Sequence, residues 1–167
     1  MRIAIVYGST TRYTERVADK IVAQPGFEEA ELLDVEDTEL SYLIKFDFII
    51  FGIPTWDYGE PQSSWQNVWD DIDNTDFKGK ICAFFGLGDQ EGYSEWFVDA
   101  MGLLHDKIVR QGGVAIGEWP TEGYHFNSQC SVAGDCFIGL PLDEVNQEHL
   151  TDERISTWCR QLREITR

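Results

Sequence analysis

The fold is indicated first by residues 2–23, which read RIAIVYGSTTRYTERVADKIVA. Arg2–Tyr7 is a short apolar run, rich in β-branched residues, and it predicts a buried strand. From about Tyr13 to Ala23 apolar residues recur at helical spacing, and Pro25-Gly26 then closes the helix. A strand that runs through a short loop into a helix begins an alternation typical of a parallel sheet covered on both faces.

The same alternation continues along the chain. Further strands are predicted at Glu31–Val35, Phe48–Ile53, Lys80–Gly86 and Val114–Gly117. Helices are predicted around Leu40–Ile44, from Pro61 onward, over Ser94–Gln111 and from a cap at Thr151. A polar segment, Glu118–Asp135, interrupts the fifth strand, which is expected to resume at Cys136–Leu140. This pattern predicts an α/β fold with an open doubly wound sheet, formed by residues 1–167 as a single domain.

Composition excludes several functions. The 167 residues include 13 Lys+Arg and 30 Asp+Glu, which gives a net charge of −17. Such a charge repels nucleic acid and anionic membrane surfaces, so neither is an expected partner. The longest apolar runs have the length of strands, and the first strand starts with no cleavable leader before it. We therefore expect an acidic cytoplasmic protein.

The cysteines fit that compartment. Cys82 lies in an apolar strand and Cys159 on an amphipathic helix, so both are expected to be buried thiols. Cys130 and Cys136 lie in the polar segment and could approach each other, but a reducing cytosol favours free thiols over a disulfide.

Three loops follow predicted strands at one edge of the sheet, where doubly wound proteins bind ligands. Gly8–Thr14 carries four hydroxyl side chains before a helix N-terminus, which indicates an anion site, although simple helix capping gives the same pattern. Pro54–Gly59 and Gly88–Tyr93 are glycine-bracketed loops with large aromatic residues that are costly to expose without a partner. Together they suit a flat conjugated ligand with a terminal phosphate.

The three loops resemble the FMN-binding loops of the flavodoxins in Gly8-Ser9-Thr10-Thr11-Arg12-Tyr13-Thr14, Pro54-Thr55-Trp56 with Gly59, and Gly88-Asp89-Gln90 with Gly92-Tyr93. Trp119–Tyr124 and Leu142–Gln147 resemble the long-chain branch, whose fifth strand is split by an insertion, and the chain is most similar to its flavodoxin 2 type. The resemblance covers essentially the whole chain.

This resemblance implies a flavodoxin-like sheet with strand order 2-1-3-4-5 and a low-potential one-electron carrier rather than an enzyme with a substrate of its own. It implies noncovalent FMN, with the phosphate held from Ser9 to Thr14, Thr55 near the ribityl chain, and the isoalloxazine between Trp56 and Tyr93. The positions implied to contact FMN are Ser9, Thr10, Thr11, Arg12, Tyr13, Thr14, Pro54, Thr55, Trp56, Asp57, Tyr58, Gly59, Leu87, Gly88, Asp89, Tyr93 and Trp96.

Two positions depart from the family pattern. Arg12 stands where the phosphate loop usually has a small residue such as Gly, and its guanidinium either bonds the phosphate or points into solvent; we expect solvent. Val145 stands where the long-chain motif often has Asp, which puts a contact with the ribityl chain in doubt.

The implied partners are basic redox proteins, such as a ferredoxin/flavodoxin-NADP reductase, and electron-accepting enzymes, with the protein acting as a monomer. Residues 57–106 contain 11 acidic and two basic residues, which gives a net charge of −9 and suggests an acidic docking face.

Three alternatives to an FMN-binding electron carrier remain. A phosphorylated receiver domain lacks support, since Gly8-Ser9 and Pro54-Thr55 stand where that fold needs acidic residues. A quinone reductase on the same fold would oxidise NAD(P)H by itself, and an acidic adaptor would bind no FMN.

Overall fold

The central sheet is built from the apolar segments of the chain. In the computed structural model, which describes residues 1–167, its parallel strands follow the order β2-β1-β3-β5-β10. Their bounds are Glu31–Asp34 for β2, Ile3–Tyr7 for β1, Phe48–Trp56 for β3, Ile81–Leu87 for β5 and Leu140–Leu142 for β10. The short β6, Val114–Ala115, pairs with the start of β5. The predicted order 2-1-3-4-5 is confirmed.

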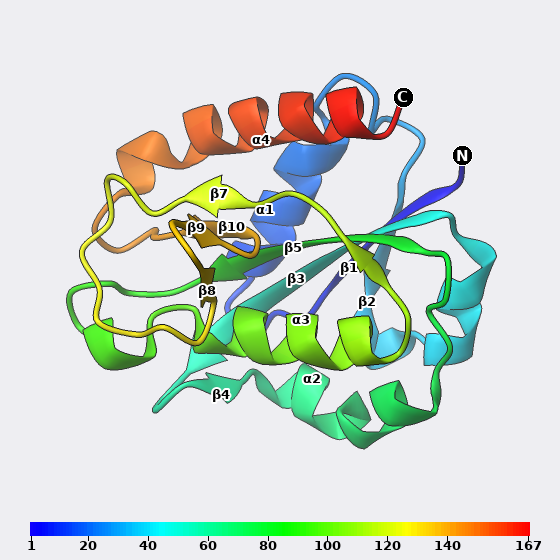
Figure 1. Cartoon of the computed structure of the whole chain (residues 1–167), viewed down its shortest axis with the longest axis horizontal. Helices are drawn as coiled ribbons and strands as arrows, with labels where there is room; N and C mark the ends of the chain where they lie inside the picture. Colours follow the sequence, from blue (N-terminus) through cyan, green and yellow to red (C-terminus); the bar gives the residue numbers. More distant parts are fainter.

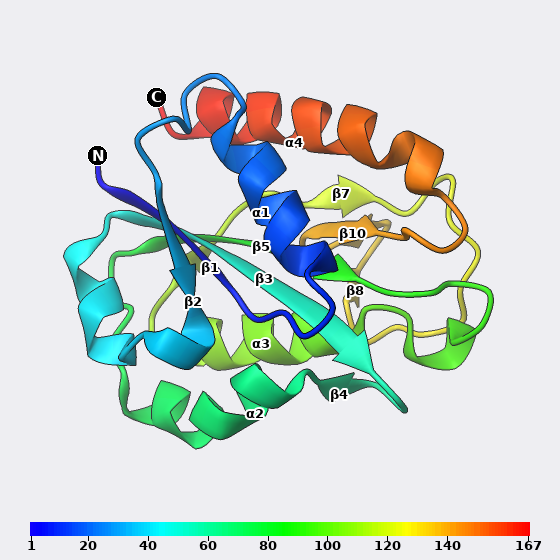
Figure 2. The same cartoon turned by 180° about the vertical axis from the view of Figure 1, so that it is seen from behind.

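Helices cover both faces of this sheet (Figures 1 and 2). Helices α1 (Tyr13–Val22) and α4 (Thr151–Ile165) lie on one face, and α2 (Ser63–Val68) and α3 (Asp99–Arg110) lie on the other. Each helix turns an apolar stripe inward, because burying that stripe is the main favourable term in its packing. The buried residues accordingly form two clusters, one on each face of the sheet.

Short elements connect these layers. The sheet-edge hairpin adds β4, Glu60–Pro61, antiparallel to the end of β3. A separate small sheet has the order β7-β9-β8, with bounds Trp119–Pro120, Cys136–Phe137 and Val132–Ala133. Short 3-10 helices occupy Val35–Asp37, Leu40–Lys45, Asp70–Asn74, Ser94–Trp96 and Glu148–Leu150.

The fifth strand resumes later than the sequence suggests. The prediction of a strand at Cys136–Leu140 is wrong, because Cys136–Phe137 joins the small antiparallel sheet and Leu140–Leu142 joins β5. Gly139 separates the two segments, and a Cβ there would lie 2.2 Å from the carbonyl oxygen of Phe84. The glycine therefore lets the chain return closely to β5, a contact that the apolar pattern does not encode.

The long helix predicted over Ser94–Gln111 is broken. A 3-10 turn at Ser94–Trp96 is followed by Val98 at φ 50°, and α3 begins only at Asp99. A left-handed β-branched residue is uncommon, and it changes the direction of the chain so that Phe97 packs inward. The apolar period concealed this break because Phe97, just before it, and Met101, Leu104 and Ile108 of α3 are all buried and recur at helical spacing.

Two predicted helix starts are also shifted. Pro61 lies in β4 rather than at the first position of α2, which begins at Ser63. Thr151 is the first residue of α4, with its hydroxyl lacking a hydrogen-bond partner, and not the cap that precedes the helix.

The expectations for the cysteines are confirmed. Cys82 and Cys159 are buried, and all four cysteines are free in the structure. Tyr124 of the insertion is buried, with its hydroxyl donating to the Pro141 carbonyl at 2.7 Å. None of the helices is both long and apolar enough to cross a membrane.

Candidate functional site

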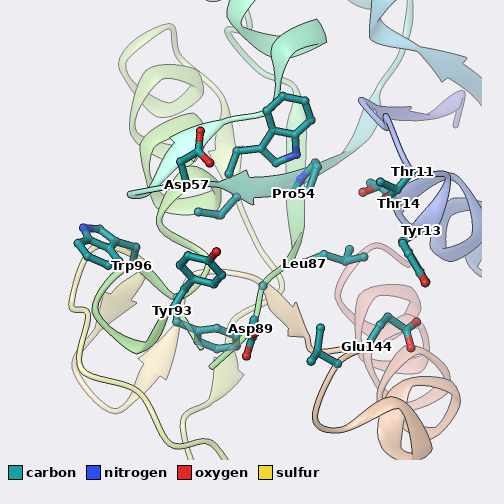
Figure 3. A pocket seen from close by; sticks show the side chains of 15 residues that line it. Thr11, Tyr13, Thr14, Pro54, Asp57, Leu87, Asp89, Tyr93, Trp96 and Glu144 are labelled. Carbon is teal, nitrogen blue, oxygen red and sulfur yellow. The ribbon is translucent and has the colours of Figure 1, made fainter. Parts of the chain in front are cut away.

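A cavity of about 520 Å³ opens at the carboxyl ends of the parallel strands (Figure 3). Its walls come from the loops that follow β1, β3, β5 and β10, and its volume is in the range of small-molecule and cofactor sites. The predicted residues that line it are Thr11, Tyr13, Thr14, Pro54, Thr55, Trp56, Asp57, Leu87, Gly88, Asp89, Tyr93 and Trp96.

Five predicted residues do not line the cavity. Ser9 and Thr10 belong to the first loop; Thr10 is exposed, and the Ser9 hydroxyl is buried without a hydrogen-bond partner. Arg12 is exposed and makes no ion pair. Tyr58 is 71% exposed and rests edge-on against Trp96, while Gly59 is buried beneath the same indole.

The first loop is held tightly against the sheet. Gly8 donates its backbone N–H to the Gly52 carbonyl at 3.2 Å, and a Cβ on Gly8 would lie 2.4 Å from Gln62 Oε1. Arg12 then adopts φ 69° before α1 begins. A left-handed residue at this point explains why a small residue suits the position, because glycine reaches positive φ without steric strain.

The second loop is the tip of the β3–β4 hairpin. Trp56 pairs with Glu60 across the hairpin, and Asp57 and Gly59 have φ values of 44° and 88°. The Thr55 hydroxyl oxygen accepts a hydrogen bond from the Ala100 N–H at 3.1 Å, which ties the hairpin to the start of α3. The hairpin thereby holds Trp56 in the wall of the cavity.

The third loop is fixed by a buried carboxylate. Asp143 is fully buried and accepts hydrogen bonds from the backbone and side chain of Gln90, at 3.1 and 2.8 Å. It also accepts from the N–H groups of Val145 and Asn146 and from the Asn146 amide, all within 3.0 Å. Burial would raise the pKa of Asp143, but the hydrogen bonds from Asn146 and Gln90 outweigh it and lower the pKa below its ordinary value.

Asn146 extends this network toward the cavity. Its side-chain amide also donates to Asp89 Oδ1 at 2.7 Å, and the same oxygen accepts from the Gly92 N–H at 2.8 Å. Gln90 Oε1 in turn accepts from the His125 N–H of the insertion at 2.8 Å. These contacts fix the loop that carries Tyr93, which lies half exposed at the cavity mouth.

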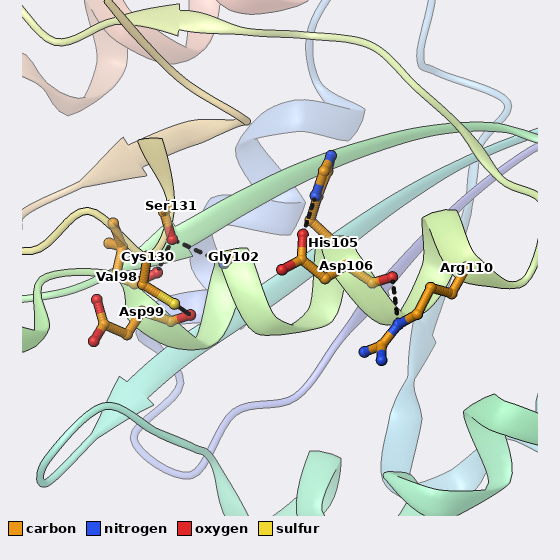
Figure 4. A network of polar contacts seen from close by, with 8 residues as sticks. All are labelled: Val98, Asp99, Gly102, His105, Asp106, Arg110, Cys130 and Ser131. Carbon is orange, nitrogen blue, oxygen red and sulfur yellow. Dashed lines mark hydrogen bonds and ion pairs between the residues drawn. The ribbon is translucent and has the colours of Figure 1, made fainter. Parts of the chain in front are cut away.

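The insertion is anchored on the first turn of α3 (Figure 4). The Ser131 hydroxyl donates to the Val98 carbonyl at 2.6 Å and accepts from the Gly102 N–H at 2.8 Å. The Ser128 hydroxyl donates to Asp99 Oδ1, and burial raises the pKa of that carboxyl. The insertion therefore supports the start of α3, which follows the third loop along the chain.

Three further residues line the cavity without having been predicted as contacts, namely Phe97, Glu144 and Val145. Phe97 is buried and also contributes to the lining of the cavity. Burial raises the pKa of the Glu144 carboxyl. A polar run directly after the last strand was the available signal for Glu144, since that edge is where ligands bind.

Comparison with known proteins identifies relatives over nearly the whole chain. The model of the flavodoxin family matches residues 5–158. Flavodoxin 2 of Escherichia coli K12 is 49% identical over 164 residues, covering 97% of this chain and 95% of that protein. A flavodoxin of Synechococcus elongatus is 44% identical over 163 residues, covering 97% and 96%. The crystal structure of Fusobacterium nucleatum flavodoxin bound to flavin mononucleotide superposes with a TM-score of 0.92 at 30% identity, covering 98% of this chain and 97% of that one.

Proposed function

The chain belongs to the flavodoxin family, and from this premise we propose that it carries single electrons at low potential on a noncovalently bound FMN. The observation that carries the proposal is the cavity at the carboxyl ends of the strands, which is lined by Trp56 and Tyr93 and by residues of the hydroxyl-rich loop. It is an electron-transfer flavoprotein without a substrate reaction of its own.

The residues present fit FMN. The buried Ser9 hydroxyl lacks a partner, and a buried polar group of this kind is normally hydrogen-bonded. A phosphate bound against the first loop would accept a hydrogen bond from the Ser9 hydroxyl. Backbone N–H groups at the start of α1 would donate to the same phosphate. The phosphate is held by Ser9, Thr10, Thr11, Tyr13 and Thr14, with Arg12 pointing into solvent.

The remaining predicted residues bind the ribityl chain and the ring. Thr55 lies beside the ribityl chain, and Trp56 and Tyr93 cover the two faces of the isoalloxazine and exclude water from it. Backbone groups near its polar edge come from Pro54, Asp57, Tyr58, Gly59, Leu87, Gly88, Asp89 and Trp96.

FMN, when bound, supplies a ring that accepts and returns electrons one at a time. The protein sets the energy of that exchange through its charges and its dielectric environment. Asp57, Asp89 and Glu144 line the cavity, and like charges nearby disfavour additional negative charge in a partly buried site. These carboxylates therefore keep the reduction potential of the bound flavin low.

Residues 1–167 act as one FMN-binding domain, as a monomer in the cytoplasm. The partners are basic redox proteins, such as a ferredoxin/flavodoxin-NADP reductase, and the enzymes that accept the electrons. The net charge of −17 supports a basic partner, because opposite charges accelerate encounter.

The test is the visible spectrum of the purified protein with FMN during stepwise reduction. We expect one FMN per chain, two separate one-electron steps, and no oxidation of NADPH by the protein alone. Rapid NADPH oxidation would favour a quinone reductase, and failure to bind FMN would favour an adaptor.

The ring-binding role of Trp56 is tested in the same assay. Trp56→Ala should weaken FMN binding by about 10- to 100-fold, since stacking of a planar base on an aromatic side chain contributes about 1–3 kcal/mol. The control is Tyr58→Ala, because only the backbone of Tyr58 is assigned to the ring and its exposed side chain lies outside the cavity lining. Equal losses in the two variants would contradict the proposed sandwich.

A further inference from the structure

Gln62 is a fully buried polar residue behind the first loop, outside the lining of the cavity. Its side-chain Nε2 donates to Thr10 Oγ1 at 2.9 Å and to Ser64 Oγ at 3.0 Å, while its Oε1 has no hydrogen-bond partner. The amide nitrogen of Gln62, which is the donor, therefore contacts both hydroxyl groups.

This direction of hydrogen bonding determines what the Thr10 hydroxyl can do. A hydroxyl has one proton to donate and two lone pairs that accept. Because Thr10 Oγ1 accepts from Gln62, its own proton remains available for another acceptor. Thr10 is exposed, so that proton is free to reach an anion held outside the loop.

The surroundings keep Gln62 in this position. A Cβ on Gly8 would lie 2.4 Å from Gln62 Oε1, so only glycine lets the loop backbone approach the amide this closely. The Gln62 carbonyl accepts from the Gln66 N–H at 3.0 Å at the start of α2. Through β4, which ends one residue earlier, Gln62 is continuous with the hairpin that carries Trp56.

We infer that Gln62 is a positioning residue for phosphate binding, which holds the Thr10 hydroxyl with its proton directed to a phosphate monoester oxygen. The inference rests on the proposed function and assigns part of the preference for a phosphorylated flavin to a residue that touches no ligand. A residue that only filled space would support binding of any flavin equally.

The experiment compares the dissociation constants of the apoprotein for FMN and for riboflavin, which lacks the phosphate, by quenching of flavin fluorescence. Gln62→Met should weaken FMN binding about tenfold and change riboflavin binding less than twofold, because one hydrogen bond to a charged group is lost or misaligned. Thr10→Val should have the same selective effect. Adding Gln62→Met to Thr10→Val should then change FMN binding less than twofold.

The matched control is Gln66→Met, the same exchange one turn later in α2, where the exposed side-chain amide donates to the Pro61 carbonyl. It should change neither affinity more than twofold. If Gln62→Met is poorly folded by circular dichroism, Gln62→Asn replaces it, since its shorter side chain also withdraws the amide from Thr10.

Equal weakening of FMN and riboflavin binding, an additive double variant, or unchanged FMN binding in Gln62→Met would each overturn the inference. Failure of the unaltered protein to bind FMN would instead reject the proposed function. The two failures are therefore distinguishable.

Discussion

Among single residues, three that are not glycine have a left-handed backbone conformation, and all three lie close to the site. They are Arg12, Asp57 and Val98, with φ values of 69°, 44° and 50°. Each precedes a change of direction, into α1, around the hairpin tip and into α3. Strained backbone is often retained at functional loops, where it fixes the shape that a ligand requires.

Arg12 gives a direct test of that strain. Arg12→Gly should raise the free energy of unfolding of the apoprotein by about 1 kcal/mol, because glycine adopts φ 69° without a Cβ clash. FMN affinity should change less than threefold, since the guanidinium is expected in solvent. Urea unfolding and fluorescence titration measure the two quantities.

The control is Arg16→Gly, which removes the same charge from within α1. It should lower the free energy of unfolding by about 1 kcal/mol, because glycine is unfavourable inside a helix. A hundredfold loss of FMN affinity in Arg12→Gly would show that the guanidinium contacts the phosphate.

At the scale of elements, the loop after β10 fixes the loop after β5 through Asp143. Asp143→Asn should lower the free energy of unfolding by about 2–3 kcal/mol near pH 7, since an amide group would face several N–H donors that the carboxylate now satisfies. Asp135→Asn, on an exposed loop, should change it by less than about 0.5 kcal/mol.

The difference between Asp143→Asn and the unaltered protein should depend on pH. The folded-state pKa of Asp143 is lowered, so its contribution is complete above the unfolded pKa of about 3.9 and is lost as pH falls through the folded value. The difference should be constant above about pH 5 and shrink in more acidic solution. A difference that grows on acidification would contradict this assignment.

The contact between α3 and the insertion is tested at Gly102. A Cβ there would lie 2.2 Å from the Cys130 carbonyl oxygen, and the Gly102 N–H donates to Ser131. Gly102→Ala should therefore lower the free energy of unfolding by about 1–3 kcal/mol through overpacking, although alanine is favoured over glycine by about 1 kcal/mol in a helix. Urea denaturation measures the sign of the change in the free energy of unfolding. A Gly102→Ala variant that is more stable would show that the insertion is free to move away from α3.

The control for Gly102 is its exposed neighbour, Leu103. Leu103→Ala alters an exposed side chain in the same turn of α3, so it should change the free energy of unfolding by less than about 0.5 kcal/mol.

Across the whole molecule, acidic residues outnumber basic ones, and several of them lie in the loops of the cavity. The segment 57–106, with its net charge of −9, includes the second and third loops of the cavity. Arg160 and Arg163 lie near Gly26 at the opposite end, where α4 ends (Figure 1). The acidic residues of the two loops, Asp57, Asp89 and Glu91 among them, would attract a basic partner to the cavity during encounter.

Electron transfer to a basic reductase should therefore slow at least tenfold as salt rises from low to about 0.5 M, since salt screens exposed charges. Stopped-flow absorbance measures the second-order rate. Glu91→Gln with Glu95→Gln should slow the reaction at low salt more than Glu28→Gln with Glu29→Gln, an exposed pair in the turn beyond α1. Rates independent of salt would defeat the proposed docking face.

Local sequence patterns predict the α/β architecture and the loops that line the cavity. The apolar runs, Gly8–Thr14 and the two aromatic loops are local patterns, and a doubly wound sheet brings the ends of its strands to one edge. The loops around the cavity could thus be expected from the residues alone, and the resemblance to the flavodoxins implied the strand order and the individual positions that contact FMN.

Packing of the folded chain sets the features that local patterns do not predict: the break at Val98, the return of the chain at Gly139, and the networks centred on Asp143 and Gln62. Each depends on groups far apart in the sequence, such as Gln62 and Thr10, which are 52 residues apart. Hydrophobic periodicity indicates which face of a helix or strand is buried, but it does not indicate which polar atoms form hydrogen bonds with each other. That choice is made when elements pack, because a buried polar group must find its partner in the folded chain.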